Sequence, residues 1–172
     1  MHNLKNIQAA IAVVRLLHVS DSAIRKGIKN FKPLPHRLEY VGTYKGIQFY
    51  DDAISTTPES TIEAIKTLKH IGTIFLGGED RGYDFRKLEK TLRKQHIHNI
   101  VLFPTSGHRI LSSRRGLNIL KTKSMKEAVS FAFRHTPEGH ICLLSTASPS
   151  YSLWKNFEEK GNLFQRCVKR RR

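Results

Sequence analysis

The sequence predicts an α/β fold, in which a mostly parallel sheet carries helices on both faces and two further helices come first. Apolar runs at residues 73–77, 99–103 and 141–145 alternate with segments of helical spacing. These runs are almost continuously apolar, as in strands that are buried on both faces. Two prolines, Pro33 and Pro35, separate this alternating part from a purely helical start. The pattern is typical of a Rossmann-like domain.

The start of the chain is expected to form two helices. Apolar residues spaced by three and four predict an amphipathic helix over residues 3–17. Ser20 or Asp21 is expected to open the second helix, and the prolines at 33 and 35 end it because proline lacks an N–H group. We therefore expect a domain boundary at this point. The two expected domains cover residues 1–36 and 37–172.

After the boundary, strands and helices alternate. The first two strands are expected to form a hairpin around residues 44–46. Expected strands cover residues 39–43, 47–50, 73–77, 99–103 and 141–145. Expected helices cover residues 58–69, 85–95, 124–133 and 150–168, with a short one near Gly107. Asp84 is expected to cap the second of these helices, and Ser124 with Glu127 forms a capping box for the third.

The chain is strongly basic. It has 30 Lys and Arg against 14 Asp and Glu, a formal net charge of +16. Such a charge suits nucleic-acid binding, but the basic residues are spread along the chain and cluster only at residues 169–172. A solvated basic surface is therefore favoured over a dedicated nucleic-acid site.

Two features bear on the cell compartment. No apolar stretch approaches the roughly 20 residues that a membrane-spanning helix needs, and the first residues do not resemble a signal peptide. The only cysteines are Cys142 and Cys167, which gives no disulfide framework. We expect a cytoplasmic protein with no membrane partner.

Four expected strands run into polar loops. The loops cover residues 51–59, 77–82, 104–108 and 145–150. In open α/β sheets, ligands bind at the carboxyl ends of the strands, so these loops can meet in space. They carry hydroxyl groups at helix starts, and Arg81 can bind a carboxylate through two parallel N–H bonds. The loops together predict a pocket for a small carboxylate-bearing ligand, although each alone reads equally well as helix caps and tight turns.

Neither a metal site nor a phosphate loop is expected in this chain. His96, His98 and His108 do not form a closed set of metal ligands. The pattern G-x-x-x-x-G-K-[ST] does not occur in the 172 residues.

Read in order, the loop sequences resemble the Mur ligase family, and within it the enzymes that add D-glutamate (MurD). The matching segments are LPHRLE at 34–39, DDAISTTPE at 51–59, LGGEDRG at 76–82, STASPS at 145–150 and KNFEEKG at 155–161. Residues 2–10 resemble the end of the family's central ATP-binding domain. The resemblance covers essentially the whole chain, as a central-domain remnant over 1–36 and a glutamate-binding domain over 37–172.

The resemblance implies roles for nine residues. Those implied to contact the nucleotide are Asn3, Asn6, Arg37 and Asp52. Those implied to bind D-glutamate are Thr56, Arg81, Ser150, Tyr151 and Phe157. It assigns no catalytic residue to this chain. Two positions depart from the family pattern: Ile54 and Arg81 stand where many members have lysine, and only Arg81 keeps the charge.

The activity implied by the resemblance is ATP-dependent amide ligation in peptidoglycan synthesis. ATP, with Mg²⁺, activates the carboxylate of UDP-N-acetylmuramoyl-L-alanine as an acyl phosphate, which the amine of D-glutamate then attacks. The N-terminal and central domains of the same enzyme are implied to hold the phosphate loop, so this fragment alone is expected to be inactive.

Three alternatives stay open. The chain could come from another Mur-type or folylpolyglutamate-type ligase. It could be a non-catalytic basic module that binds nucleic acid. It could also be a truncated gene product without its partner domain.

Overall fold

The structure is a computed structural model that describes residues 2–171, except for the side chains of His2, Asn3 and Lys5. The side chain of Asn3, one of the residues implied to contact a nucleotide, therefore lies outside the described residues. The chain divides into two compact units, one up to Leu34 and one from Pro35 onwards. Nowhere in the described part is a helix long and apolar enough to cross a membrane.

The first unit consists of two helices, as expected. Helix α1 covers His2–Leu16 and helix α2 covers Asp21–Asn30. The Ser20 side chain caps α2 by accepting a hydrogen bond from the Ala23 N–H at 3.3 Å. Helix α2 has no buried residue. The two helices and the segments that follow them leave large apolar side chains exposed, namely Leu4, Val13, Leu16, Leu17, Val19, Ile28, Phe31 and Leu34.

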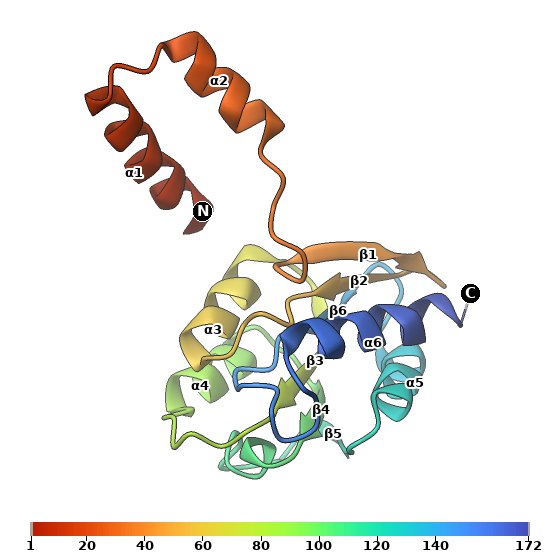
Figure 1. The fold of residues 1–172 in the computed structure, drawn as a ribbon. Coiled ribbons are helices and arrows are strands. Elements are labelled where there is room, and N and C mark those ends of the chain that lie inside the picture. Colours follow the sequence, from red (N-terminus) through yellow and green to blue (C-terminus); the bar gives the residue numbers. More distant parts are fainter. Residues whose placement is uncertain (1, 172) are drawn as a thin grey trace. The chain divides into compact units, whose positions relative to one another are not determined.

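The second unit is built on a six-stranded sheet with the order β1-β2-β6-β3-β4-β5 (Figure 1). The strands are β1 (Glu39–Tyr44), β2 (Ile47–Asp51), β3 (Ile71–Gly77), β4 (Asn99–Phe103), β5 (Asn118–Lys121) and β6 (Ile141–Leu144). Strands β1 and β2 form the expected antiparallel hairpin. The other neighbours all pair in parallel. The mostly parallel α/β fold is thus confirmed.

Helices cover both faces of this sheet (Figure 1). They are α3 (Pro58–Thr67), α4 (Arg86–Lys94), α5 (Met125–His135) and α6 (Phe157–Lys169), with a 3-10 turn, η1, at Ser106–His108. Successive residues of β3 point to opposite faces: Ile74 and Leu76 pack with α3 and α4, whereas Phe75 packs with α5 and α6. Two apolar cores therefore flank one sheet, which explains why its strands read as continuous apolar runs.

Two expectations were wrong. Strand β5 was not foreseen, because it is a four-residue edge strand whose end residues, Asn118 and Lys121, are exposed. The last helix begins at Phe157, not near 150, and the residues before it form a loop. The Asn156 side chain caps this helix by accepting from the Glu159 N–H at 2.8 Å. The sequence signal Asn-x-x-Glu was present and was overlooked.

The helix caps agree with the sequence in part. The N-cap of α4 is Phe85, which forms no side-chain capping bond; Asp84, the expected cap, lies one residue earlier and accepts a hydrogen bond from the Arg86 N–H at 3.0 Å. Ser124 accepts from the Glu127 N–H at 3.3 Å, which is half of the expected capping box. The Glu127 carboxylate accepts instead from the Thr122 hydroxyl, whose oxygen takes the Ser124 N–H at 2.9 Å. The Glu127 carboxylate is thus connected to the Ser124 N–H through the Thr122 hydroxyl, and not directly as in a capping box.

Helix α6 lies against the first loop of the second unit at Gly161. This glycine is buried, and a Cβ added there would collide with the imidazole Nδ1 of His36 and lie 2.7 Å from Oδ2 of Asp51. In an exposed helix, replacing glycine by alanine stabilises by roughly 1 kcal/mol. At Gly161 the close approach of His36 and Asp51 should make the same substitution destabilising.

We therefore predict that Gly161→Ala destabilises the folded protein by about 1–3 kcal/mol, because the added methyl group forces His36 and Asp51 apart. Urea unfolding monitored by circular dichroism measures this change. Asn162→Ala, at the exposed neighbouring position of α6, is the matched control and should be neutral or slightly stabilising. Equal effects of the two substitutions would contradict the packing argument.

Candidate functional site

Four loops leave the carboxyl ends of neighbouring strands. They follow β2, β6, β3 and β4, which are adjacent in that order in the sheet. Because these strands are parallel to one another, their carboxyl ends lie at one edge. The sequence expectation that the loops share an edge is met by this topology.

Backbone hydrogen bonds join the loops to one another. The Gly77 N–H donates to the Thr146 carbonyl and the Glu79 N–H to the Pro149 carbonyl, both at 2.8 Å, which ties the loop after β3 to the loop after β6. The Gly78 carbonyl accepts from the N–H groups of Thr105 and Ser106, at 2.6 and 2.9 Å, in the loop after β4. The hydroxyl of Thr146 also reaches the carbonyl of Ser55 in the loop after β2, at 3.5 Å. Hydrogen bonds thus connect all four loops.

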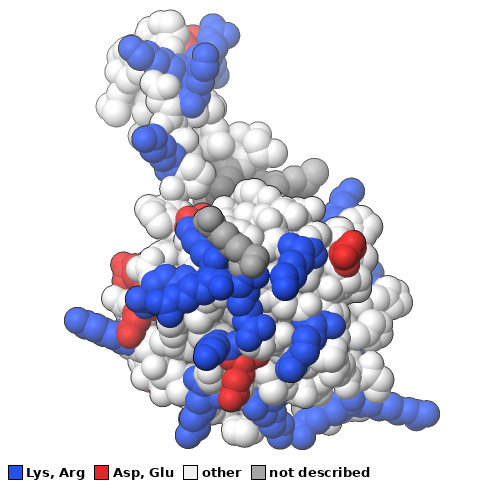
Figure 2. Space-filling model, turned by 90° about the vertical axis from the view of Figure 1, so that its right-hand side faces the viewer, with Lys and Arg blue, Asp and Glu red and all other residues white. Residues whose placement is uncertain are grey.

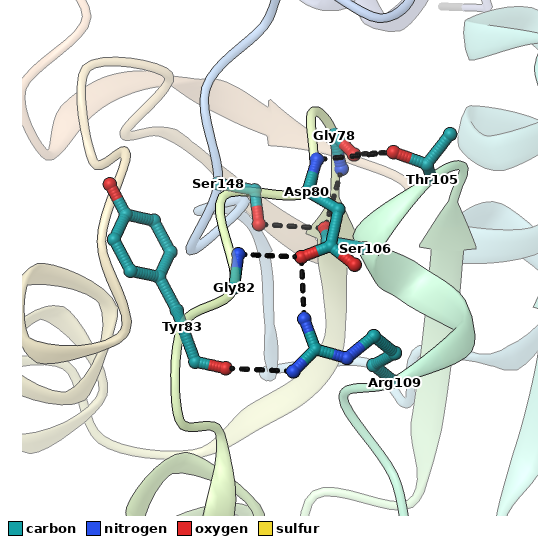
Figure 3. Close-up of polar contacts among 8 residues, drawn as sticks. All are labelled: Gly78, Asp80, Gly82, Tyr83, Thr105, Ser106, Arg109 and Ser148. Carbon is teal, nitrogen blue, oxygen red and sulfur yellow. Dashed lines mark hydrogen bonds and ion pairs between the residues drawn. The ribbon is translucent and has the colours of Figure 1, made fainter.

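A buried pair of serines joins two of these loops. The hydroxyl oxygen of Ser106 accepts the Gly78 N–H at 3.1 Å and lies 2.7 Å from the hydroxyl oxygen of Ser148 (Figure 3). Gly78 has φ +159°, and a Cβ there would collide with the Pro149 carbonyl oxygen. The glycine is therefore required for the close approach of two loops.

Arg109 holds the loop that carries Arg81. Its Nη1 donates to Asp80 Oδ1 at 2.6 Å, and the same oxygen accepts the Gly82 N–H at 2.9 Å (Figure 3). Its Nη2 also reaches the Tyr83 carbonyl at 3.5 Å. The loop is thus fixed on both sides of Arg81. Sequence reasoning missed Arg109, because no local pattern links it to Asp80, 29 positions away.

Two of the residues expected to bind glutamate lie close together, and a third, Ser150, is next to one of them in the chain. The guanidinium carbon of Arg81 is 5.9 Å from the centroid of the Tyr151 ring, and its Nε donates to Glu79 Oε2 at 3.0 Å. Ser150 precedes Tyr151 and is buried, and its hydroxyl oxygen has no hydrogen-bond partner among the described residues. Such an unpaired buried hydroxyl is costly in a folded protein and calls for an explanation, such as a ligand.

The other two expected glutamate-binding residues lie just before or at the start of a helix. Thr56 is half-buried, next to Thr57, the N-cap of α3. Phe157 is the first residue of α6, and its ring lies edge-on to the His36 imidazole with centroids 6.2 Å apart. Neither forms a hydrogen bond to Arg81 within the described residues. Of these five residues, the structure shows a direct contact only between Arg81 and Tyr151.

The expected nucleotide-binding residues are divided between the units. Asn6 is exposed on α1, and Arg37 is half-buried at the start of the second unit. Asp52 is buried after β2 and accepts hydrogen bonds from the Leu38 N–H at 3.2 Å and the Ser145 hydroxyl at 2.7 Å. Burial raises the pKa of Asp52, although the hydrogen bonds from Ser145 and Leu38 oppose the rise. Asp52 thus uses its carboxylate to hold the loops in place.

Lys160 is a second residue that sequence reasoning missed. It is fully buried, its Nζ donates to the Thr146 hydroxyl at 2.6 Å, and it lies 5.9 Å from the Trp154 ring centroid. Burial lowers the pKa of Lys160 to about 7, although the charges of Asp51 and Asp52 oppose this fall. The lysine lies within the KNFEEKG segment, so the signal was present but carried no assigned role.

The segment that opens the second unit is anchored by His36 and Asp51. His36 Nδ1 lies 2.7 Å from Asp51 Oδ2, and the His36 N–H donates to Glu39 Oε2 at 2.8 Å. One ligand atom from each of these three residues lies within 4.8 Å of the others. Asp51 also accepts from Ala53 N–H and Gln165 Nε2, at 3.0 Å each, so its oxygens are already used. The cluster suits hydrogen bonding, and it does not fit Mg²⁺, which prefers an all-oxygen octahedral shell.

A family described as "Mur ligase, glutamate ligase domain" matches residues 36–148, which is more than half of the chain. The chain belongs to the Mur ligase family. This confirms the resemblance seen in the loop sequences.

Curated Mur ligases match along almost the whole chain. A protein of Desulfitobacterium hafniense (strain Y51), named UDP-N-acetylmuramoylalanine--D-glutamate ligase, is 36% identical over 98% of this chain. A Prochlorococcus marinus (strain NATL2A) protein of the same name is 38% identical, also over 98% of it. The chain spans only 38% and 37% of these relatives' own lengths.

Solved Mur-type structures share the fold. The MurF ligase of Thermotoga maritima in complex with ADP matches with a TM-score of 0.68 at 18% identity, over 98% of this chain and 39% of that one. E. coli FolC in complex with DHPP and ADP matches with a TM-score of 0.66, also at 18% identity, over 97% and 39%. At this identity, the likeness supports the architecture alone.

The buried Lys160 predicts a pH dependence of stability. Between its folded pKa of about 7 and the ordinary value of 10.5, the unfolded chain binds more protons at this position than the folded chain does. The free energy of unfolding therefore gains a contribution that rises with pH across this window. Lys160→Met should flatten the rise, whereas Lys155→Met, at an exposed position, should not. Urea titrations from pH 7 to pH 9 measure the slopes, and equal slopes for both variants would count against a depressed pKa.

Proposed function

We propose that this chain is the glutamate-binding part of an ATP-dependent ligase that joins D-glutamate to UDP-N-acetylmuramoyl-L-alanine in peptidoglycan synthesis. The observation that carries the proposal is the approach of Arg81 to Tyr151, on loops that are joined by hydrogen bonds. Ser150, next to Tyr151 in the chain, has a buried hydroxyl with no hydrogen-bond partner among the described residues. The names of the Desulfitobacterium and Prochlorococcus relatives support the choice of D-glutamate.

The proposed ligand matches the chemistry of the side chains at this edge of the sheet. A guanidinium binds a carboxylate through two parallel hydrogen bonds, so Arg81 suits one carboxylate of glutamate. The Ser150 hydroxyl can donate to the ligand, which would satisfy an otherwise unpaired buried group. Thr56, two residues before α3, adds a hydroxyl donor, and Phe157, the first residue of α6, adds an apolar wall. Arg109 and Asp80 keep the Arg81 loop in place.

In this reading, the chain's residues bind and orient, and none of them transfers a proton or forms a covalent bond. Fixing both carboxylates leaves the amine of glutamate as the free end, directed away from Arg81. Holding two reactants in a productive geometry can supply several kcal/mol of the barrier reduction. ATP supplies the chemical activation of the acceptor carboxylate.

The remaining roles form part of the same proposal. Asn3, Asn6, Arg37 and Asp52 would contact the nucleotide, and residues 1–36 would be helices of a central domain that binds ATP and Mg²⁺ together with the phosphate loop. Residues 37–172 would form the glutamate-binding domain. The two cysteines are free, which agrees with a place in the reducing cytoplasm.

A nucleic-acid-binding function would depend on the basic surface of the protein. Figure 2 shows Lys and Arg gathered on the face that carries α5 and α6. Burial raises the pKa of the half-buried Cys167 thiol, and the nearby cations Arg170, Arg166, Arg171 and Lys126 oppose the rise. They lie on or directly after the helices and not on the bonded loops. The charge therefore does not explain the unpaired hydroxyl of Ser150, which the ligase proposal does.

We predict that Arg81→Ala weakens D-glutamate binding to the 172-residue protein by about tenfold or more, because a charge-assisted hydrogen bond contributes about 1.5–3 kcal/mol. Isothermal titration or NMR shift perturbation measures it. Arg86→Ala is the matched control, since Arg86 is exposed and pairs with Asp84 on α4. An unchanged affinity in Arg81→Ala would remove Arg81 from the pocket.

A ligand panel separates the ligase alternatives. We expect D-glutamate to bind more tightly than L-glutamate, diaminopimelate or D-alanyl-D-alanine. Preference for another amino acid would assign the chain to a different branch of the family. Binding of none of them, together with steeply salt-dependent binding of nucleic acid, would favour the basic module instead.

We also predict that the 172-residue protein shows no ligase turnover with ATP, D-glutamate and UDP-N-acetylmuramoyl-L-alanine, because its sequence contains no phosphate loop. Phosphate release measures turnover, with the Desulfitobacterium relative assayed in parallel as the positive control. Turnover at the rate of that relative would show that this chain contains its own ATP site.

A further inference from the structure

The loop after β6 is held at two points by the buried side chain of Lys160. Near the start of the loop, the Thr146 hydroxyl oxygen accepts a hydrogen bond from Lys160 Nζ at 2.6 Å. Further along, the centroid of the Trp154 ring lies 5.9 Å from the same Nζ, which is within the range of a cation–π contact. Lys160 belongs to α6 and is fully buried. One ammonium group from a helix therefore contacts both ends of segment 146–154.

The Trp154 end of this segment fixes the backbone at Ser150. The Ser150 carbonyl accepts from the Trp154 N–H at 3.0 Å and from the Leu153 N–H at 3.1 Å. Ser150 carries the buried hydroxyl without a partner among the described residues, and the next residue is Tyr151, which Arg81 approaches. The contact with Trp154 thus acts on the part of the loop that carries two of the expected glutamate-binding residues.

The Thr146 end connects the segment to two other loops. The Thr146 hydroxyl donates to the Ser148 carbonyl at 3.0 Å, and the Ser148 hydroxyl oxygen lies 2.7 Å from that of Ser106 in the loop after β4 (Figure 3). The Thr146 carbonyl accepts the Gly77 N–H at 2.8 Å, at the start of the loop that carries Arg81. The hydrogen bond from the buried lysine therefore lies at the point where three loops are joined.

Packing alone does not explain a lysine at this position. Within the described part of the chain, Thr146 is the one hydrogen-bond partner of Lys160 Nζ, and no carboxylate forms an ion pair with it. A buried charge is costly even when it is paired, and apolar side chains of similar size often stabilise a core better. The ammonium group therefore calls for a role in the arrangement of the loop.

We propose that Lys160 is a positioning residue for the glutamate pocket, which holds segment 146–154 in the shape that presents Ser150 and Tyr151 to the ligand. The inference rests on the proposed glutamate-binding function. Lys160 acts through Thr146 and Trp154, and it does not itself contact the ligand. Binding groups are effective only when the residues around them fix their geometry.

The protonation state of Lys160 bears on this role. Burial lowers the pKa of Lys160 to about 7, against the opposing charges of Asp51 and Asp52. A protonated lysine has three donors and no acceptor, so the Thr146 oxygen must accept from it and the Thr146 proton is left for the Ser148 carbonyl. A neutral amine has a lone pair and can take that proton instead. The protonated form therefore holds the loop more firmly.

The first test is calorimetric titration of the 172-residue protein with D-glutamate. Lys160→Met keeps the length of the side chain and removes its donors, and it should weaken binding by about tenfold or more. Lys160→Arg keeps the charge and the donors and should bind more tightly than the methionine variant. Lys169→Met, at the exposed end of α6, is the matched control and should bind like the wild type.

A pH series separates positioning from a merely structural role. From about pH 6 to about pH 8, the affinity of the wild type for D-glutamate should fall as Lys160 loses its proton, whereas Lys160→Met should show no such fall. Over the upper part of this range, the contribution of Lys160 to stability rises with pH. A structural role alone would move affinity and stability in the same direction. Asp51, Asp52 and the His36 that pairs with Asp51 are present in both proteins, so their titration cancels in the comparison.

Amide hydrogen exchange tests the loop without any ligand. In Lys160→Met, the N–H groups of Gly77 and Trp154 should exchange about tenfold faster, because their acceptors lie on the released segment, while the Ile141 N–H of β6 should keep its protection. Thr146→Val breaks the same hydrogen bond from the other side and replaces Lys160→Met if that variant does not fold.

The outcomes distinguish this inference from the function on which it rests. Unchanged exchange at Gly77 and Trp154 would overturn the positioning role, whether or not the affinity falls. An unchanged affinity for D-glutamate in Lys160→Met would overturn it as well. Faster exchange in the variant, with no D-glutamate binding even by the wild type, would support the role of Lys160 in the loop and refute the glutamate assignment.

Discussion

The close backbone approach at Gly78 is the constraint on which the carboxyl edge depends. Its carbonyl accepts two N–H groups from the loop after β4, its own N–H donates to Ser106, and its Cα lies against the Pro149 carbonyl of the loop after β6. Any side chain at this position would push the loops apart. This contact lies three residues before Arg81 and next to Ser150, so it holds together the two loops that carry them. Backbone contacts therefore fix the arrangement of the loops at the carboxyl edge, and their side chains provide the polar groups.

The fold was largely predictable because its strands are buried on both faces. Ile74, Phe75 and Leu76 leave no polar gap, so the strand is evident without any alignment, and the polar loops then fall at one edge by topology alone. Strand β5 was not predictable in the same way. Only Ile119 and Leu120 of this strand are partly buried, because an edge strand has one neighbour and its end residues are exposed. The start of α6 was misplaced because apolar spacing was followed in place of the cap at Asn156.

The candidate site was predictable where its chemistry is local in sequence. Arg81, Ser150 and Tyr151 lie on loops that carry recognisable segments, so they could be named from sequence. Arg109 and Lys160 could not, because they act through partners 29 and 14 positions away, Asp80 and Thr146.

The anchoring of His36 limits how the two units can be joined. His36 is buried and tied to Asp51 and Glu39, and α2 ends at Asn30, so only residues 31–35 remain as an exposed connector. Five residues span at most about 17 Å when fully extended, and the two prolines among them stiffen the segment. The connector is thus a short, stiff tether with one end locked into the sheet domain.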